Sequence, residues 1–401
     1  MNKNIKIKKI NQKNTYLTSK TKDKELNTIL KNEQERQAKD INLIASENLC
    51  LPEINAIAHN IFASKYAEGT VGNRFYQGCK FVDTLEQLAT ERAKKLFGAE
   101  SANVQPHCGS TANLIAYHAL VKPKEKILSM SLNAGGHLSH GYSKHISSQL
   151  YEFIHYGVDP ISGLIDYSMI EDQVKKERPR LIVSGASAYS RLIDYEKIHT
   201  IAKQYNCLHL VDMSHIAGLV AGKAIPSPIP YADIVTSTTQ KTLRGTRGAF
   251  ILSKKEFEQK INQAIMPGIQ GGPFVHLFAA KAALFKLATE KRYQVYQKQV
   301  IENAQFMANI CQKNGLTVVS GGTDTHLFLI DLTKAGKTGK EIAALLEQQN
   351  IIVNKNAIPN DPLSPLITSG IRIGTPTVTA EKRTKKELED ITNKIIKTIK
   401  Q

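Results

Sequence analysis

A single lysine, Lys241, stands in a segment whose residue types suit covalent chemistry. The stretch DIVTSTTQKTLRGTRG (233–248) reads as a strand ending in hydroxyl side chains, followed by the lysine and a turn rich in Gly and Arg. An amine that forms a Schiff base needs a fixed position and nearby cations that lower its pKa. The hydroxyls could bind a phosphate or the imine. The alternative interpretation is an ordinary solvated lysine after a strand.

Asp212 is the second candidate, because it ends the buried-looking strand of CLHLVDMSHIAG (207–218), with His215 three residues later. A carboxylate in such a place needs a cationic partner or a hydrogen-bond donor. The protonated pyridine nitrogen of a cofactor would serve, and its charge would make the ring an electron sink. A structural salt bridge explains the residue about as well.

Two loops add candidate ligand-binding groups. In ANVQPHCGSTAN (102–113), Gly109 and Ser110 precede a helix, and free amides at a helix N-terminus can bind a phosphate. A capped helix without a ligand is the alternative. In AGGHLSHG (134–141), two histidines stand three residues apart. Because no third ligand stands nearby at suitable spacing, we expect no metal site, and favour an imidazole stacked on a flat ring or a turn histidine.

The elements that must position these residues alternate between strands and helices. A helical pattern over 195–205 separates the first two of four strands, which we expect at 181–185, 208–212, 233–237 and 249–253. This alternation predicts an α/β fold with a mainly parallel sheet and helices on both faces. Functional loops are expected at the carboxyl ends of such strands.

The pattern changes after Pro273. A helical region over 274–314, strands at 316–322 and 326–332, and a final helix over 382–399 predict a smaller C-terminal α+β domain. The final helix has Leu388, Ile391, Ile395 and Ile399 at helical spacing. We therefore expect an N-terminal tail and helix over 1–40, the helix at about 24–39, a large domain over 41–280 and a small domain over 281–401.

Composition limits the class of protein. The 401 residues are long enough for two domains, and no apolar run is long enough to span a bilayer. Five scattered cysteines indicate a reducing compartment. The net charge of +17 is spread along the chain, which favours a solvated lysine-rich surface over nucleic-acid or membrane binding. The basic N-terminus lacks an apolar signal core, so we expect a mostly disordered tail and a cytoplasmic protein.

The ordered set of motifs resembles serine hydroxymethyltransferases, from about Asn42 to Thr375. The resemblance rests on NLIASEN, KYAEG, RFYQGC, NVQPHCGS, GGHLSHG, SAYSR, VDMSHIAGLVA, STTQKTLRG, PGIQGGP, SGGTDTHLFL, VNKNAIPNDP and TSGIRIGTP. It implies the fold-type-I architecture of pyridoxal-phosphate transferases. It also implies a homodimer or tetramer whose active sites are shared between subunits.

The resemblance implies a role for each matching residue. Lys241 would bind pyridoxal phosphate covalently, Asp212 would pair with its ring nitrogen, and His137 would stack on the ring. The other implied cofactor contacts are His215, Ser187, Gly109 and Ser110, with Gly271 and Gly272 from the neighbouring subunit.

The substrate contacts are implied in the same way. Arg372 would hold the amino-acid carboxylate through two parallel bonds, and Glu68 of the neighbouring subunit would be the acid–base group at the serine hydroxymethyl or the folate. Ser46, Tyr66 and Tyr76 would position the substrate, with Tyr76 counted among the catalytic residues. The implied folate contacts are Leu132, Gly136, Leu138, Asn356, Ser364, Pro365 and Leu366.

The chain departs from the family pattern at several positions. Gln240 replaces the usual histidine before the lysine, at a position linked to substrate and reaction specificity, and a glutamine cannot titrate. Cys108 replaces the first serine of the phosphate loop and is a weaker donor. The remaining departures are Phe75, Ile269, Thr246 and Lys80.

The expected reaction is reversible transfer of the serine hydroxymethyl carbon to tetrahydrofolate, giving glycine and 5,10-methylenetetrahydrofolate. A folate-independent threonine or β-hydroxy-amino-acid aldolase is the alternative that Gln240 keeps open. A nucleic-acid-binding protein that kept the fold, and a purely structural subunit, are further alternatives. The presence of Lys241, Asp212 and Arg372 argues against both.

Overall fold

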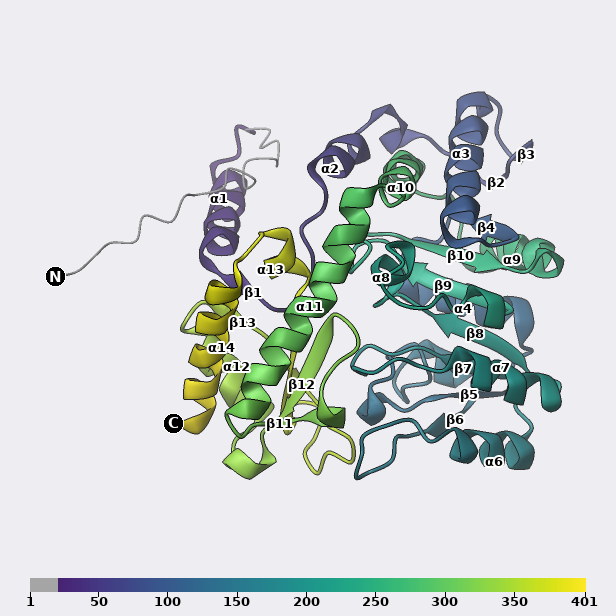
Figure 1. Ribbon diagram of the computed structural model, residues 1–401. Helices are drawn as coiled ribbons and strands as arrows, with labels where there is room; N and C mark the ends of the chain where they lie inside the picture. The colour runs from purple at the N-terminus through teal and green to yellow at the C-terminus, as the bar shows by residue number, and fades with distance from the viewer. Residues whose placement is uncertain (1–20) are drawn as a thin grey trace.

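The computed structural model describes residues 21–401, which form a seven-stranded sheet, a four-stranded sheet and two two-stranded sheets (Figure 1). The large sheet has seven strands in the order β4-β10-β9-β8-β7-β5-β6. The five strands from β9 to β6 run parallel, whereas β10 is antiparallel to both of its neighbours. The strands are β4 (Ser101–Asn103), β5 (Lys126–Met130), β6 (Glu152–Tyr156), β7 (Leu181–Ser184), β8 (Leu208–Asp212), β9 (Ile234–Thr238) and β10 (Ala249–Ser253).

Helices cover both faces of this sheet. Side chains alternate along each strand, so the buried strands present apolar residues to both faces. In β10, Phe250 and Leu252 pack with helices α3 and α10, while Ala249 and Ile251 pack with α4 and α9 on the opposite face. The predicted α/β fold with a mainly parallel sheet is thus confirmed. The helices of this part are α2 (Pro52–Ala58), α3 (Lys80–Phe97), α4 (Gly109–Leu120), α5 (Ile146–Leu150), α6 (Tyr167–Glu177), α7 (Tyr195–Gln204), α8 (Ala217–Ala221), α9 (Glu258–Gln263) and α10 (His276–Leu287).

The smaller sheet is antiparallel, in the order β11-β12-β15-β14. It lies near the C-terminus, as expected, and packs with the long helix α11 (Lys291–Lys313) and with α14 (Lys385–Lys400). The four apolar residues predicted to line one face of the last helix are all buried. The other elements are β11 (Thr317–Val318), β12 (Leu327–Asp331), β14 (Asn354–Asn356), β15 (Gly370–Gly374), α12 (Gly339–Glu347) and α13 (Pro376–Ala380).

Two expected elements differ from the structure. The helical region over 274–314 is two helices, α10 and α11, separated at residues 288–290. The strand expected over 316–322 is only the two residues of β11, because Ser320, Gly321 and Gly322 have positive φ values and turn the chain. The apolar run 316–319 favoured a strand, although the Ser-Gly-Gly sequence that follows it is typical of a turn.

The N-terminal segment connects to the small sheet region. After α1 (Lys24–Lys39), β1 (Ile41–Asn42) pairs with β13 (Ile351–Ile352), and Leu43 is buried in the same core as α14. The chain then enters the large part at α2, whose Ile54 and Ala58 are buried in its core, and continues into a short hairpin of β2 (Gly69–Thr70) and β3 (Asn73–Arg74). The domain boundaries at 41 and 281 stay predictions.

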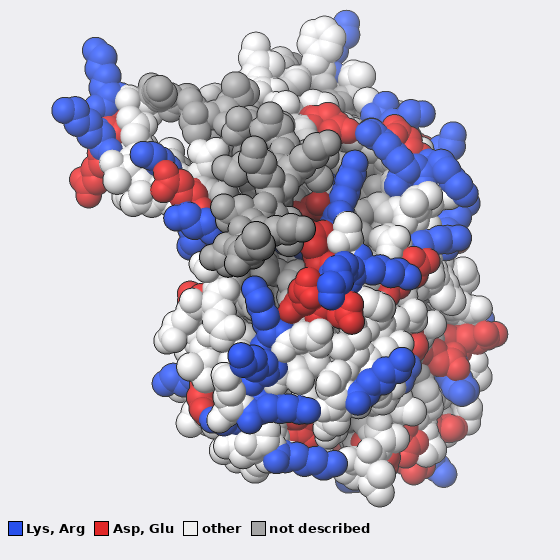
Figure 2. Space-filling model, turned by 60° about the vertical axis from the view of Figure 1, so that its left-hand side comes forward, with Lys and Arg blue, Asp and Glu red and all other residues white. Residues whose placement is uncertain are grey.

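Short turns of helix complete the description. They are η2 (Ile61–Ser64), η3 (Leu132–Ala134), η4 (Ile229–Tyr231), η5 (Lys255–Phe257), η6 (Ala264–Ile269), η7 (Val319–Gly321) and η8 (Thr333–Ala335). Within residues 21–401, no helix is both long enough and apolar enough to cross a membrane. On the face that Figure 2 shows, Lys and Arg side chains are interspersed with acidic and uncharged ones. The disordered tail expected at the N-terminus falls largely on residues 1–20, which lie outside the described residues.

Candidate active site

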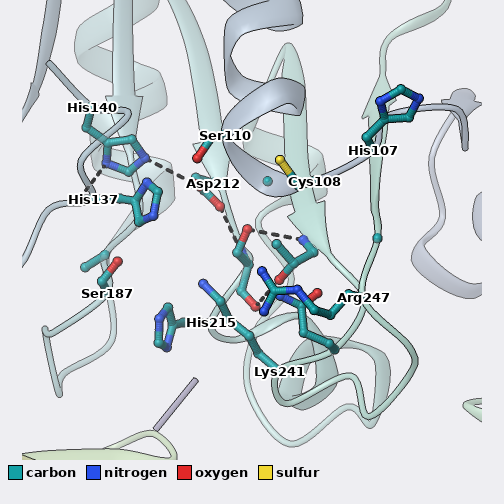
Figure 3. A pocket seen from close by; sticks show the side chains of 16 residues that line it. His107, Cys108, Ser110, His137, His140, Ser187, Asp212, His215, Lys241 and Arg247 are labelled. Atoms are coloured by element: carbon teal, nitrogen blue, oxygen red, sulfur yellow. Dashed lines mark hydrogen bonds and ion pairs between the residues drawn. The ribbon is translucent and has the colours of Figure 1, made fainter. Parts of the chain in front are cut away.

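A cavity lies at the carboxyl ends of the parallel strands β7, β8 and β9 (Figure 3). It brings together eight of the predicted site residues, which come from five separate stretches of sequence. These are Gly109, Ser110, His137, Ser187, Asp212, His215, Gln240 and Lys241. Its lining also includes His107, Cys108, His140, Ala186, Ser214, Thr238, Arg247 and Gly248.

Asp212 ends β8 and is held in one orientation by three donors. Its Oδ2 accepts hydrogen bonds from Asn113 Nδ2 at 2.8 Å and His140 Nε2 at 3.1 Å, and its Oδ1 accepts one from the Ser214 amide at 3.0 Å. Burial opposes ionisation, but the hydrogen bond from His140 and nearby positive charges outweigh it and keep the pKa of Asp212 well below its usual range. The cavity therefore contains a fixed carboxylate anion.

A chain of hydrogen bonds connects Asp212 to His137. Asn113 donates to Ser139 Oγ at 2.8 Å, and Ser139 Oγ lies 2.8 Å from His137 Nδ1. The Ser139 amide also donates to His137 Nδ1, at 3.2 Å. Since Nδ1 accepts this bond, the neutral ring carries its proton on Nε2. Burial lowers the pKa of His137 to about 4, so the imidazole is uncharged at neutral pH.

Lys241 follows β9, and its backbone is fixed by the turn that contains it. Its carbonyl accepts bonds from Asn48 Nδ2 at 3.0 Å and from the Arg244 amide at 3.1 Å. Burial of the amine lowers the pKa of Lys241 to about 8; Arg372 and Arg247 act in the same direction, and Asp212 opposes them. A neutral, nucleophilic amine is therefore accessible near physiological pH.

This titration gives a prediction for the protein without cofactor. Because its pKa is lowered, the neutral fraction of Lys241 should rise steeply from pH 7 to 9, and acylation of Lys241 should follow it with a midpoint near pH 8. Lys255 is a control, because its hydrogen bond with Glu258 raises its pKa. Mass spectrometry of both lysines after brief acylation measures the two profiles. Coincident profiles would contradict the lowered pKa of Lys241.

The N-terminus of α4 forms the opposite wall of the cavity. Cys108 is the N-cap residue and makes no side-chain cap; its Sγ lies 3.2 Å from Thr111 Oγ1. The backbone is packed closely here, since a Cβ added at Gly109 would lie 2.7 Å from Thr238 Cγ2. With Ser110 and Arg247 in the lining, this wall has the hydrogen-bond donors and positive charge that a phosphate needs.

Cys108 gives a second prediction. A serine hydroxyl is a stronger donor than a thiol, so Cys108→Ser should tighten pyridoxal-phosphate binding by about 1 kcal/mol, roughly five-fold. Titration of the cofactor-free protein measures the Kd. Cys50→Ser is the matched control, because Cys50 does not line the cavity. A Kd that is unchanged or weaker in Cys108→Ser would exclude a donor role at this position.

Arg372 and His215 lie where the small sheet meets the cavity. Arg372, on β15, donates from Nη1 to the Ser187 carbonyl at 2.6 Å and from Nη2 to Asn354 Oδ1 at 2.7 Å. Burial lowers its pKa to about 10, so it stays a cation at neutral pH. His215 Nδ1 lies 3.1 Å from Nε2 of His326, which the sequence had not indicated. Ser46, expected to help position the substrate, is half-buried in the turn after β1 and does not line the cavity.

Five predicted site residues form a second cluster at the surface. Tyr76 Oη donates to Glu68 Oε2 at 2.9 Å, and the rings of Tyr66 and Tyr76 lie 6.1 Å apart. Cβ atoms added at Gly271 and Gly272 would contact Glu68 and Tyr66 respectively, at 3.1 Å in each case. None of the five lines the cavity of its own chain. Tyr66 is 64% exposed and Tyr76 43%, which leaves this cluster free to contact another molecule.

The predicted folate contacts lie on two loops. Leu132, Gly136 and Leu138 belong to the loop after β5, close to His137. Asn356 ends β14, and the exposed residues Ser364, Pro365 and Leu366 precede β15. Among residues 21–401, no hydrogen bond joins the two groups.

Sequence reasoning missed several residues of the site although it quoted the motifs that contain them. His140, which bonds Asp212, is the second histidine of GGHLSHG, and Asn113 ends the stretch around the phosphate loop. Their roles depend on the close approach of β8 to α4 and the 134–141 loop, which no local spacing shows. Among the described residues, no three His, Cys, Asp or Glu side chains are grouped as metal ligands.

The groups that line the cavity can be compared with the groups that a bound cofactor would need. The cavity has a reactive amine, a fixed carboxylate, a neutral imidazole and a donor-rich helix N-terminus, all at strand ends of one sheet. The Oε1 atom of Gln240 is buried without a hydrogen-bond partner, as expected where a polar ligand completes the site. The residues present fit pyridoxal phosphate, and the arrangement is that of a fold-type-I pyridoxal-phosphate enzyme.

Comparison with known proteins identifies the family within this class of enzymes. Residues 19–395 match the family model described as serine hydroxymethyltransferase. The chain is also 52% identical, over 349 residues, to serine hydroxymethyltransferase 2 of Pseudomonas fluorescens, covering 86% of this chain and 84% of that protein. The chain belongs to the serine hydroxymethyltransferase family.

Proposed function

We propose that this protein transfers the serine hydroxymethyl carbon reversibly to tetrahydrofolate in the cytoplasm, with Lys241 and Asp212 as the residues that make the reaction possible. The observation that carries the proposal is their presence in one cavity, where the amine has a pKa of about 8 and the carboxylate is fixed by three donors. Pyridoxal phosphate, when bound, supplies the electron sink for the charge left on the amino-acid α-carbon.

The protein's own groups have distinct tasks in this proposal. Lys241 would hold the cofactor covalently through its amine. Asp212 keeps a proton on the ring nitrogen, and the uncharged face of His137 suits stacking on a flat ring. Arg372, a cation beside Ser187, binds the substrate carboxylate. Ser187 and His215, which line the cavity, would contact the phenolic oxygen of the cofactor, while Gly109 and Ser110 would bind its phosphate.

The substrate and folate would lie between these groups and the outer loops. Glu68 moves the proton at the serine hydroxymethyl or the folate, with Tyr76 hydrogen-bonded to it. Tyr66 and Ser46 help to position the amino acid. The two loops at 132–138 and 356–366 bind tetrahydrofolate. Formation of glycine from serine, measured with and without tetrahydrofolate, tests this function, and with tetrahydrofolate an equal amount of 5,10-methylenetetrahydrofolate should form. Glycine production that needs no folate would contradict it.

A folate-independent aldolase is the second candidate, and Gln240 is the observation that favours it. The side chain lies beside Lys241 in the cavity, and its buried Oε1 has no partner among the described residues. It can accept a hydrogen bond from a substrate but cannot carry a proton as a histidine can. Turnover of threonine or another β-hydroxy amino acid at rates that exceed serine turnover would support this candidate.

The exposed cluster supports a site shared between two subunits. Tyr66, Glu68, Tyr76, Gly271 and Gly272 lie together, away from the cavity lining of their own chain, as residues that complete a neighbour's site would. We propose a homodimer or tetramer in which this cluster faces the cavity of the next subunit. A two-fold interface would then form two equivalent sites.

Mixed dimers test this arrangement. Glu68→Gln and Lys241→Ala should each be inactive alone, yet one hybrid site would combine Lys241 of one chain with Glu68 of the other. An equal mixture refolded together should regain about a quarter of the wild-type activity, because half the dimers are hybrids with one working site. Differently tagged chains verify that hybrids form. Hybrids without activity would place Glu68 in its own chain's site.

A further inference from the structure

Lys281 is a buried lysine whose charged form has incomplete charge compensation. It lies on α10 and is only 4% exposed. Its Nζ donates to the carbonyl of Val104 and, at 3.4 Å, to that of Pro106. Carbonyl dipoles solvate an ammonium only in part, and a buried charge without a counter-charge costs free energy.

The carboxylate that influences Lys281 is already bound by other groups. Glu86 acts on Lys281 through space, but its Oε2 pairs with Arg74 and its Oε1 accepts a bond from Gln105 Nε2 at 2.7 Å. The other titratable groups that interact electrostatically with Lys281 are His107 and His276, which add no negative charge. Within residues 21–401, the buried ammonium therefore has no carboxylate of its own.

The ammonium lies directly behind the wall of the cavity. A Cβ added at Gly248, a lining residue, would be 3.1 Å from Lys281 Cε and 3.6 Å from its Nζ. The carbonyls that Lys281 binds belong to the backbone that leads into His107, Cys108 and Gly109. Lys281 thus both supports this loop and places positive charge behind it.

We propose that Lys281 is a charge-compensating and positioning residue for the cofactor phosphate, which supplies the anion that the buried ammonium lacks. This rests on the proposed function in one respect, that the phosphate lies at the wall formed by residues 108–110 and 248. The interaction passes through one layer of backbone in a region of low polarity, where a charge remains effective over several ångströms.

The same arrangement predicts that the protein takes up a proton when the cofactor binds. Burial lowers the pKa of Lys281 to about 7, so at pH 8 most of the molecules without ligand have a neutral amine. A phosphate dianion nearby favours the charged form and raises this pKa, so binding should draw a proton onto Lys281. The contribution of Lys281 to cofactor affinity should be full below pH 7. It should fall as pH rises through the higher pKa that Lys281 has in the cofactor-bound protein.

The experiment compares two ligands and two variants. Cofactor-free protein is titrated calorimetrically at pH 8 with pyridoxal phosphate and with pyridoxal, in buffers of different ionisation enthalpy, which gives both Kd and the number of protons taken up. Lys281→Gln keeps a donor for the carbonyls but removes the charge. Lys286→Gln is the matched control, since it removes an exposed lysine from the same helix.

We expect Lys281→Gln to weaken pyridoxal-phosphate binding about ten-fold or more and pyridoxal binding about two-fold at most. Wild type should take up nearly one proton more than Lys281→Gln with pyridoxal phosphate, and no extra proton with pyridoxal. The chemistry at Lys241 is common to both ligands, and a free phosphate with its second pKa near 6 is already a dianion at pH 8. The differences in affinity and in proton uptake between the two ligands therefore measure the effect of Lys281 on the phosphate.

Equal weakening for both ligands, or equal proton counts in wild type and Lys281→Gln, would reduce Lys281 to a structural hydrogen-bond donor and overturn the proposal. If the variant did not fold, the two ligands on wild type would still decide, because equal proton uptake for both contradicts the proposal. Failure of wild type to bind either ligand would instead overturn the cofactor site of the proposed function, and this role with it.

Discussion

Lys241→Ala should bind no pyridoxal phosphate covalently and should show no measurable serine turnover. Among the described residues, this amine is the only lysine in the cavity lining, and without it the cofactor is held by noncovalent contacts alone. The absorbance of bound cofactor after dialysis and the rate of 5,10-methylenetetrahydrofolate formation measure the two effects.

Lys255→Ala is the matched control for this variant, because it removes an exposed lysine that pairs with Glu258 outside the site. It should keep wild-type cofactor content and activity. Near-normal turnover by a correctly folded Lys241→Ala would show that the reaction does not depend on this amine, and the proposed mechanism would be wrong.

Asp212→Asn should retain the cofactor but lose about 10²-fold or more in kcat. A carboxamide cannot supply the negative charge that keeps a proton on the ring nitrogen, so less charge from the α-carbon can be accommodated. Because His140 and Asn113 bond the carboxylate, the substitution also disturbs their hydrogen bonds. Steady-state kinetics with saturating cofactor separates kcat from cofactor loss.

Asp233→Asn is the control for loss of a buried carboxylate from the same sheet. Asp233 precedes β9, at the opposite end of the strand from Lys241, and accepts a bond from the His209 amide at 2.9 Å. We expect this variant to lose stability but keep its kcat. A cofactor-saturated Asp212→Asn with wild-type kcat would contradict the role proposed for the carboxylate.

Local sequence patterns predicted the parts of the fold in which a buried strand coincides with a continuous apolar run. Strands β7 to β10 are almost continuously buried and β-branched or apolar, so their apolar runs predicted them to within one residue. The turn at 320–322 was overlooked because the apolar run before it favoured a strand, although Gly321 and Gly322 are residues that adopt positive φ values readily.

The site shows a similar limit. Lys241 and Asp212 were found because their residue types and their positions at strand ends are visible in the sequence. Lys281 and His326 were not, since their burial and contacts depend on how α10 and the start of β12 pack against the large sheet. A lysine in an otherwise apolar helix segment, FAAKAALF, is a weak signal of such burial.

The most direct test of the central claim is the absorbance spectrum of the pyridoxal-phosphate-loaded protein with glycine, before and after tetrahydrofolate is added. We predict a band from covalently bound cofactor, lost in Lys241→Ala, and a strong long-wavelength band that appears only when glycine and tetrahydrofolate are both present. A bound-cofactor band that tetrahydrofolate leaves unchanged would contradict the folate-linked function and favour the aldolase.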